Sequence, residues 1–139
     1  MSKRTFIWFG VLLVVLAFVI PFAIFRAKGD GETGGTEVPA SLKDGQSLFV
    51  TNCGTCHTLY SAGTDGNYAP NLDELLAPAG PAEGPTADET IKQLEGRVLN
   101  AVENGVDGST TPGRMPARIL NEEQAKEVSE FVARTAGEG

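Results

Sequence analysis

Residues 5–25 contain no charged side chain, and this run divides the chain into two chemically different parts. An α-helix rises 1.5 Å per residue, so about 20 apolar residues span the roughly 30 Å hydrocarbon layer of a membrane. The run predicts a single transmembrane helix, and we assign residues 1–28 to an N-terminal membrane anchor. The competing interpretation is a cleaved secretory signal, which has a shorter apolar core and small residues before the cut. The one candidate cleavage site follows Ala27, and the bulky Phe25 lies two positions before Ala27.

The rest of the chain is acidic and begins with a linker. Residues 29–40 hold four glycines, three acidic residues and one proline without periodicity, which is typical of a flexible connection. Residues 29–139 carry seven basic and eighteen acidic side chains, a net charge of −11. Phosphate binding needs a basic face, so no nucleic acid partner is expected. One histidine and two cysteines exclude a multi-histidine metal site and a disulfide-rich scaffold.

The most informative residues are Cys53-Gly54-Thr55-Cys56-His57, a C-x-x-C-H string. This string is the attachment signature of c-type haem. Two thiols three residues apart lie on one side of a helical turn, where they can form thioethers with the two vinyl groups of one porphyrin. The histidine that follows can then point its imidazole at the iron as the proximal ligand. The spacing therefore predicts one covalently bound haem c, held by Cys53, Cys56 and His57.

Three other uses of the motif compete with haem attachment. A thioredoxin-like redox pair would require a βαβ pattern around the cysteines, which the flanking sequence lacks. A zinc site would require four ligands, and beyond Cys53, Cys56 and His57 the sequence has no further cysteine or histidine. Two inert buried cysteines would leave the export signal and the rest of the pattern unexplained.

The sixth iron ligand is argued by elimination. A second histidine ligand is impossible because the chain has one histidine, and soft thioether sulfur is the next usual partner. Met1 lies on the other side of the predicted anchor, which leaves Met115, in a loop rich in proline and glycine at 111–116. A methionine that fills a gap in a core usually belongs to a helical pattern, and Met115 does not. A lysine ligand or an open site is the alternative.

The outer part of the chain is predicted to be helical, because apolar side chains recur there at spacings of three and four and no long segment alternates with period two. The expected helices run from Ser41 to the haem motif, over 72–76, from Thr86 to Asn104, and from Asn121 to the residues before Gly137. The hydroxyl of Ser41 can cap the first helix. The last two begin with pairs at capping-box spacing, Thr86/Glu89 and Asn121/Gln124.

In this order the elements resemble a class I c-type cytochrome. The resemblance covers residues 41–139 and rests on the C-x-x-C-H motif, Asn-Tyr-Ala-Pro-Asn-Leu at 67–72, Gly-Arg-Met-Pro at 113–116 and a terminal helix with Phe131. It implies an all-α fold around one haem, in which the first and last helices cross and bring Gly45 and Phe49 against Phe131. It also implies that the Pro70 carbonyl accepts a hydrogen bond from the imidazole of His57 and so orients the ring.

The sequence departs from better-known members of that family in two respects. It has no tryptophan outside the anchor, which leaves the partners of the haem propionates open, with Tyr60, Tyr68, Arg97 and Arg114 as candidates. The Pro/Gly tract at 78–85 is longer than the minimal pattern, and we expect a surface loop there that could cover a haem edge.

The predicted function is electron transport by a membrane-tethered mono-haem cytochrome. With both axial positions filled, the iron has no site for substrate and would cycle between Fe(II) and Fe(III), at the relatively high potential that Met/His ligation favours. The resemblance implies partners in a respiratory or photosynthetic chain, a quinol:cytochrome c reductase as donor and a terminal oxidase as acceptor. It also implies that the haem domain lies on the extracytoplasmic face of the membrane, with the N-terminus in the cytoplasm.

Two other functions stay open. The chain could be a fixed cytochrome c subunit of a reductase or terminal oxidase complex, with its apolar helix packed against others. It could also be a ligand-binding or peroxidase-like haem protein, which would need an open iron position and would leave Met115 without a role as ligand.

Overall fold

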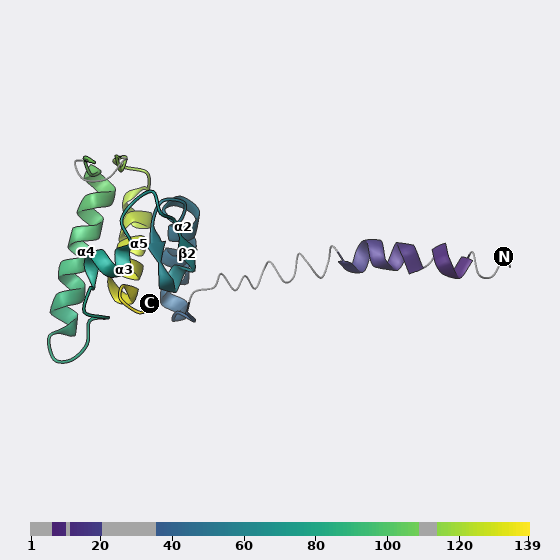
Figure 1. Ribbon diagram of the computed structural model, residues 1–139, viewed down its shortest axis with the longest axis horizontal. Coiled ribbons are helices and arrows are strands. Elements are labelled where there is room, and N and C mark those ends of the chain that lie inside the picture. The colour runs from purple at the N-terminus through teal and green to yellow at the C-terminus, as the bar shows by residue number, and fades with distance from the viewer. Residues whose placement is uncertain (1–6, 11, 21–35, 109–113) are drawn as a thin grey trace. The chain divides into compact units, whose positions relative to one another are not determined.

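The computed structural model describes residues 7–10, 12–20, 36–108 and 114–139. The chain divides into two compact units, Met1–Glu32 and Thr33–Gly139. In the first unit, residues 7–10 and 12–20 are helical (Figure 1). These residues are exposed. Among the described residues, no helix is both long enough and apolar enough to cross a bilayer. Parts of the predicted anchor (1–6, 11 and 21–28) and of the linker (29–35) lie outside these residues.

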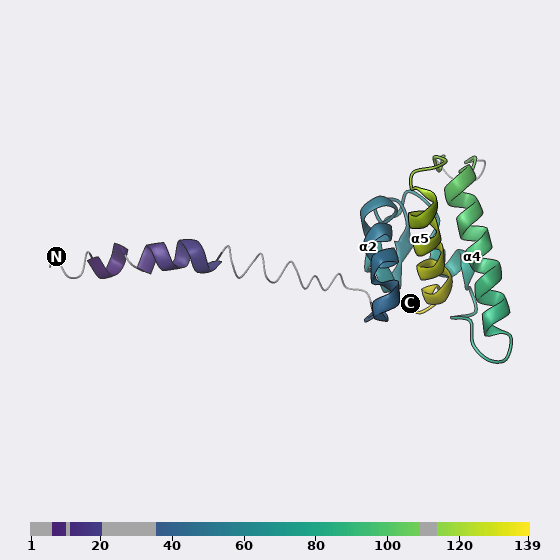
Figure 2. The same cartoon turned by 180° about the vertical axis from the view of Figure 1, so that it is seen from behind.

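The second unit is built on three longer helices, and α5 packs against both α2 and α4. Figure 2 shows α5 between the other two. In chain order its elements are the 3-10 turn η1 (Ala40–Leu42), α2 (Lys43–Asn52), β1 (Thr58–Leu59), η2 (Tyr60–Ala62), β2 (Thr64–Asp65), α3 (Leu72–Leu76), α4 (Ala87–Asn104) and α5 (Glu122–Thr135). The predicted helical domain is confirmed.

Helix ends were predicted with mixed success. Asn121 and Gln124 form the full capping box, with the Asn121 side chain accepting from the Gln124 amide at 2.9 Å. The capping role predicted for Ser41 is wrong, because the chain enters α2 through η1, and Leu42 precedes the helix. Thr86 precedes α4 as expected but makes no side-chain cap, since its backbone (φ −106°, ψ 8°) is not in the extended region that a capping residue usually adopts.

A small antiparallel hairpin, which sequence periodicity did not predict, follows the C-x-x-C-H turn. Its strands β1 and β2 pair Thr58 with Asp65 and Leu59 with Thr64. Gly63 reverses the chain between them in the left-handed region (φ 63°), which glycine adopts at little cost. Strands of two residues are too short to show alternation, so the all-α prediction holds for the helices and fails for this segment.

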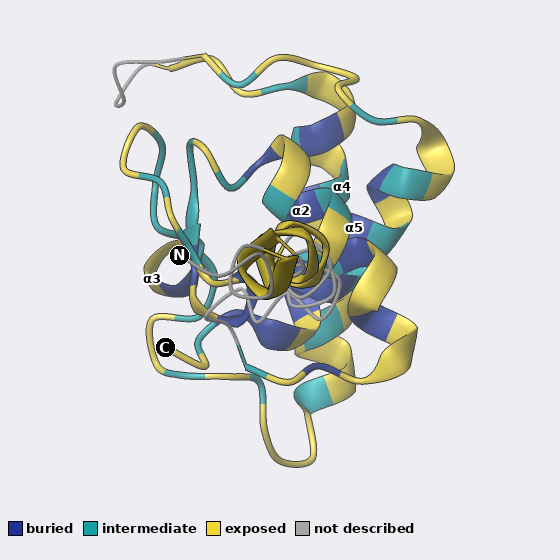
Figure 3. Ribbon diagram, turned by 90° about the vertical axis from the view of Figure 1, so that its right-hand side faces the viewer, coloured by how far each residue is buried: buried dark blue, intermediate teal, exposed yellow. Residues whose placement is uncertain are grey.

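The core centres on the crossing of α2 and α5. Figure 3 shows buried positions (dark blue) on both helices. The rings of Phe49 and Phe131 lie 6.1 Å apart at 59°, a tilted arrangement favoured by aromatic quadrupoles. Gly45 is buried, and a Cβ added there would lie 2.7 Å from the Cβ of Phe131. The predicted contact of Gly45 and Phe49 with Phe131 is confirmed, and glycine sets how closely the helices approach.

The folded unit begins before Ser41. Val38 is buried with the core residues, and the Thr36 hydroxyl donates to the Glu138 carboxylate at 2.8 Å. The same Glu138 oxygen accepts from the Ser61 hydroxyl at 2.7 Å. Residues 36–40 of the predicted linker therefore belong to the packed domain.

The Pro/Gly tract at 78–85 is irregular and mostly exposed, as a surface loop should be. It lies against the C-terminal end of the chain, because a Cβ added at Gly137 (φ 90°) would lie 2.6 Å from the Gly80 carbonyl carbon. The buried carboxylate of Asp73 fixes the same end, accepting the amide of Gly137 at 2.8 Å and that of Tyr60 at 2.9 Å. The tract thus packs on the C-terminal residues.

We expect Gly45→Ala to destabilise the haem domain by about 1–3 kcal/mol, because the added methyl group has no space between α2 and α5. Thermal unfolding followed by circular dichroism measures this change. Gly96→Ala is the matched control. Gly96 lies in α4 with no atom within 4 Å of an added Cβ, so alanine there should raise stability by about 0.5–1 kcal/mol. Equal melting temperatures for the two variants would contradict the close helix crossing.

Candidate haem-binding site

The C-x-x-C-H segment continues from α2 as a tight turn. The amides of Cys53 and Gly54 both donate to the Phe49 carbonyl, and the His57 amide donates to the Cys53 carbonyl at 2.9 Å. Cys53 and Cys56 are free thiols and line the same crevice, so the structure brings them to one side, as their spacing predicted. Burial, with a smaller contribution from Cys56, raises the pKa of the Cys53 thiol to about 11.

The imidazole of His57 is oriented by Pro70. Its Nδ1 lies 2.8 Å from the Pro70 carbonyl oxygen, and because a carbonyl can only accept, Nδ1 carries the proton. In the neutral ring this leaves Nε2 with a lone pair, the form in which histidine binds a metal. The Ala69 amide donates to the Cys56 carbonyl at 2.9 Å and holds the segment that carries Pro70 against the turn.

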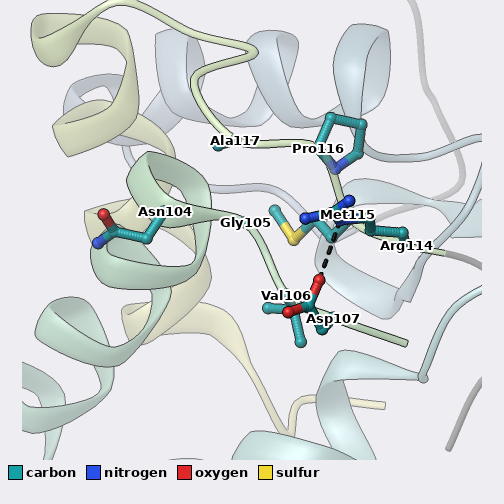
Figure 4. A pocket seen from close by; sticks show the side chains of 8 residues that line it. All are labelled: Asn104, Gly105, Val106, Asp107, Arg114, Met115, Pro116 and Ala117. Atoms are coloured by element: carbon teal, nitrogen blue, oxygen red, sulfur yellow. Dashed lines mark ion pairs between the residues drawn. The ribbon is translucent and has the colours of Figure 1, made fainter. Parts of the chain in front are cut away.

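Met115 enters the site from the segment after α4. Its backbone forms a two-bond bridge with Val106, at 3.0 and 3.1 Å. Gly105 has φ 72°, and a Cβ there would lie 2.6 Å from the Met115 carbonyl oxygen, so this turn needs glycine. Met115 also lines a pocket of about 320 Å³ (Figure 4). Arg114 and Asp107, which line the same pocket, form an ion pair with 3.0 Å between nitrogen and oxygen. Residues 111–113 of the predicted methionine loop lie outside the described residues.

These residues meet in one crevice of about 490 Å³, within the usual size range of cofactor pockets. All five predicted site residues line it: Cys53, Cys56, His57, Pro70 and Met115. The rest of its lining comes from the end of α2, residues 68–70, α3, one side of α4, residues 106–107 and 114–116, and Ile119. None of the loop residues 78–85 lines the crevice, so the expectation that this tract covers a haem edge is not met.

Three of the four candidate partners of the haem propionates line the crevice. Tyr68, Arg97 and Arg114 line it, whereas Tyr60 does not. Arg114 is already paired with Asp107, and both side chains are largely exposed. Arg97, on α4, takes part in no ion pair between described residues.

The donor set and the shape of the crevice fit a covalently attached haem. Two thiols, an imidazole nitrogen and a thioether sulfur face a largely apolar space, with cationic side chains at its rim. Across 7–10, 12–20, 36–108 and 114–139, no group of three or more histidine, cysteine or acidic side chains is placed to hold a metal ion.

Comparison with known proteins agrees with this geometry. The sequence profile of the Cytochrome c family matches residues 42–136. The crystal structure of the c-type cytochrome SorU from Sinorhizobium meliloti is similar to the chain, with 31% sequence identity and a TM-score of 0.51 over 70% of this chain and 92% of that one. No curated protein sequence matches the chain.

The chain belongs to the cytochrome c family, and its helix order and haem motif make it a class I c-type cytochrome. Membership of this family implies covalently bound haem c and the role of an electron carrier. The structure brings together the residues that the sequence predicted for haem binding, and their roles in holding haem stay predictions. The contacts of Val106 and Gly105 with Met115 were not predicted, because no local sequence pattern indicates them.

We expect a variant with both cysteines replaced, Cys53→Ala with Cys56→Ala, to be largely unfolded. Without haem, the largely apolar walls of the crevice would be exposed to water and would lose their contacts with the cofactor, and a typical domain is stable by only about 5–15 kcal/mol. Far-UV circular dichroism against the haem-loaded chain measures the effect. A cooperative melt of the variant at the wild-type temperature would contradict the expectation.

Proposed function

We propose that this protein is a single-haem electron carrier whose iron is held between His57 and Met115. The observation that carries the proposal is that both side chains line the one crevice that also contains Cys53 and Cys56. His57 is the chain's only histidine, and Met1 is the only other methionine, far outside the crevice segments of the sequence. The imidazole nitrogen of His57 and the thioether sulfur of Met115 are therefore the two proposed iron ligands.

Each residue has a distinct part in this proposal. Cys53 and Cys56 supply the two thioether bonds, and Pro70 holds the His57 ring so that Nε2 is available. Bound haem supplies one-electron exchange between Fe(II) and Fe(III), at a potential that Met/His ligation raises. Met115 closes the remaining position and so keeps small ligands away.

Arg97 and Tyr68 are the proposed partners of the haem carboxylates. Two of the seven basic residues in 29–139 line the crevice, against one of the eighteen acidic residues, Asp107. An otherwise acidic domain therefore presents net positive charge where two carboxylates would lie. Arginine is suited to such contacts because its planar guanidinium can donate two parallel hydrogen bonds to a carboxylate.

We expect Met115→Ala to abolish the weak long-wavelength absorption band of iron bound to thioether sulfur, while the haem stays covalently attached. The reduction potential should fall, and the reduced variant should bind carbon monoxide at neutral pH, because the sulfur no longer occupies the iron. Ile119→Ala is the control, since it also removes a crevice side chain but no sulfur. Ready carbon monoxide binding by the reduced wild-type protein would instead favour a ligand-binding haem protein.

The proposal includes a membrane tether formed by residues 5–25. Their lack of charge supports it, as does the exposure of large apolar side chains in the helical residues 7–10 and 12–20, Trp8 at 75% and Phe18 at 74%. In this arrangement the haem domain lies on the extracytoplasmic side, where c-type haem is attached in this family. A tether replaces free diffusion by motion near the membrane and so raises the local concentration at membrane complexes.

The proposed partners are a quinol:cytochrome c reductase type donor and a terminal oxidase type acceptor. The net charge of −11 on residues 29–139 suits fast and weak docking to basic patches on such complexes. A fixed position within one of these complexes is the other arrangement compatible with the same chemistry.

Membrane vesicles from cells that make the full chain test the tether and the docking together. We expect the haem protein to resist alkaline carbonate extraction and to be cleaved by protease added to the extracytoplasmic side. Its rate of oxidation by the terminal oxidase should fall as ionic strength rises, because salt screens the attraction. Release by carbonate would disprove the anchor. A rate of oxidation that does not depend on ionic strength would disprove electrostatic docking. Stoichiometric co-purification with one complex in mild detergent would indicate a fixed subunit.

A further inference from the structure

The hairpin after the haem motif brings one hydroxyl onto the backbone of His57. Thr64 Oγ1 donates to the His57 carbonyl at 3.0 Å and accepts from the Leu59 amide at 3.1 Å. The Leu59 carbonyl lies farther from the same oxygen, at 3.5 Å, so the single hydroxyl proton is best placed toward His57. Thr64 is half-buried, which limits competition from water for these two bonds.

The methyl group of Thr64 also contacts the turn. A Cβ added at Gly54 would lie 2.5 Å from Thr64 Cγ2, so glycine inside the C-x-x-C-H motif leaves the space that Thr64 fills. Gly66, two residues on, comes equally close, since a Cβ there would lie 2.6 Å from the Cys56 carbonyl carbon and 2.8 Å from the His57 nitrogen. The hairpin and the residues after it therefore pack directly on the attachment turn.

His57 is thus held at three points: its amide by Cys53, its ring by Pro70, and its carbonyl by Thr64. The first two contacts do not fix the peptide plane after His57. If the Thr64 hydroxyl were absent, that half-buried carbonyl would lose its donor, and the chain between His57 and Pro70 could shift. The bond from His57 Nδ1 to Pro70 would then weaken.

We propose that Thr64 is a positioning residue for the proximal ligand, acting through the His57 backbone to keep the ring on the Pro70 carbonyl. The inference rests on the proposed function, in which His57 binds the haem iron. A hydrogen bond from Nδ1 makes the imidazole a stronger electron donor, which stabilises Fe(III). Loss of the Thr64 hydroxyl therefore raises the reduction potential.

Thr64→Val in the full haem-loaded chain tests this, because valine keeps the shape and the methyl contact but has no hydroxyl. We expect a higher reduction potential than in wild type and about tenfold faster solvent exchange of the His57 Nδ1 proton, followed by NMR in the reduced protein. A tenfold change corresponds to about 1.4 kcal/mol, the size of one net hydrogen bond. Exchange of the Ala136 amide, which bonds to the Val132 carbonyl at the end of α5, should not change.

Two further variants separate positioning from stability. Thr64→Ser keeps the hydroxyl and should restore the wild-type potential. Thr90→Val removes an exposed hydroxyl that donates to the Thr86 carbonyl at the start of α4, and it should leave both readouts unchanged. If Thr64→Val does not fold, the comparison of Thr64→Ser with Thr64→Ala decides, since both lack the methyl group and differ in the hydroxyl.

An unchanged potential and unchanged Nδ1 exchange in Thr64→Val, or the same shifts in Thr90→Val, would overturn the role of Thr64. So would equal potentials for the Ser and Ala variants. The wild-type spectrum separates this failure from failure of the proposed function. Absence of both the c-type bands and the sulfur band in wild type would overturn the two proposals together, whereas their presence beside an unaffected Thr64→Val overturns only this one.

Discussion

The close crossing of α2 and α5 links the hydrophobic core to the site. Phe49 is almost fully buried, stacks at an angle on Phe131 and also lines the crevice. The attachment turn leaves α2 four residues later, with the amides of Cys53 and Gly54 still bonded to the Phe49 carbonyl. Because Gly45 lets the helices approach, one phenylalanine both fills the core and places the cysteines. A change in helix spacing would therefore move the cofactor attachment.

The two halves of the crevice are held by different means. On the histidine side, side-chain and backbone hydrogen bonds fasten a short hairpin and the Pro70 segment to the turn. On the methionine side, a two-bond backbone bridge to Val106 and the Arg118 amide on the Val102 carbonyl hold the chain. Arg118 has φ 55°, a conformation that costs energy for a residue other than glycine and is kept here by its surroundings.

Much of the site could be predicted from the sequence because covalent chemistry demands a fixed spacing. The cysteines and histidine must be close in the chain, and elimination leaves Met115 as the predicted second ligand because the chain has only two methionines. The structure places Met115 in the same crevice as His57. Apolar side chains recur along the helices with a clear helical period. The capping box of Asn121 and Gln124 could be predicted because both residues lie within one helical turn. Features that depend on tertiary contacts could not be found in this way. The two-residue strands carry no period, and the contact between Thr64 and His57 exists only because Gly63 reverses the chain.

The same limit explains the wrong details. Ser41 has a capping side chain, yet burial of Val38 and Leu42 sets the entry to α2 through a 3-10 turn. The Pro/Gly tract looked like a cover for the cofactor, but contacts at Gly137 place it beside the C-terminal end. Local propensity identifies which segments are irregular, while packing decides where they lie.

The burial of Cys53 has a consequence for maturation. In the closed domain this thiol is 7% exposed and has a pKa of about 11, so at neutral pH it is protonated and shielded. Since the thiolate is the nucleophilic form of cysteine, the completed fold is a poor substrate for forming the first thioether. Attachment through Cys53 is therefore easier while the chain is still open around α2 than after the domain has closed over this thiol.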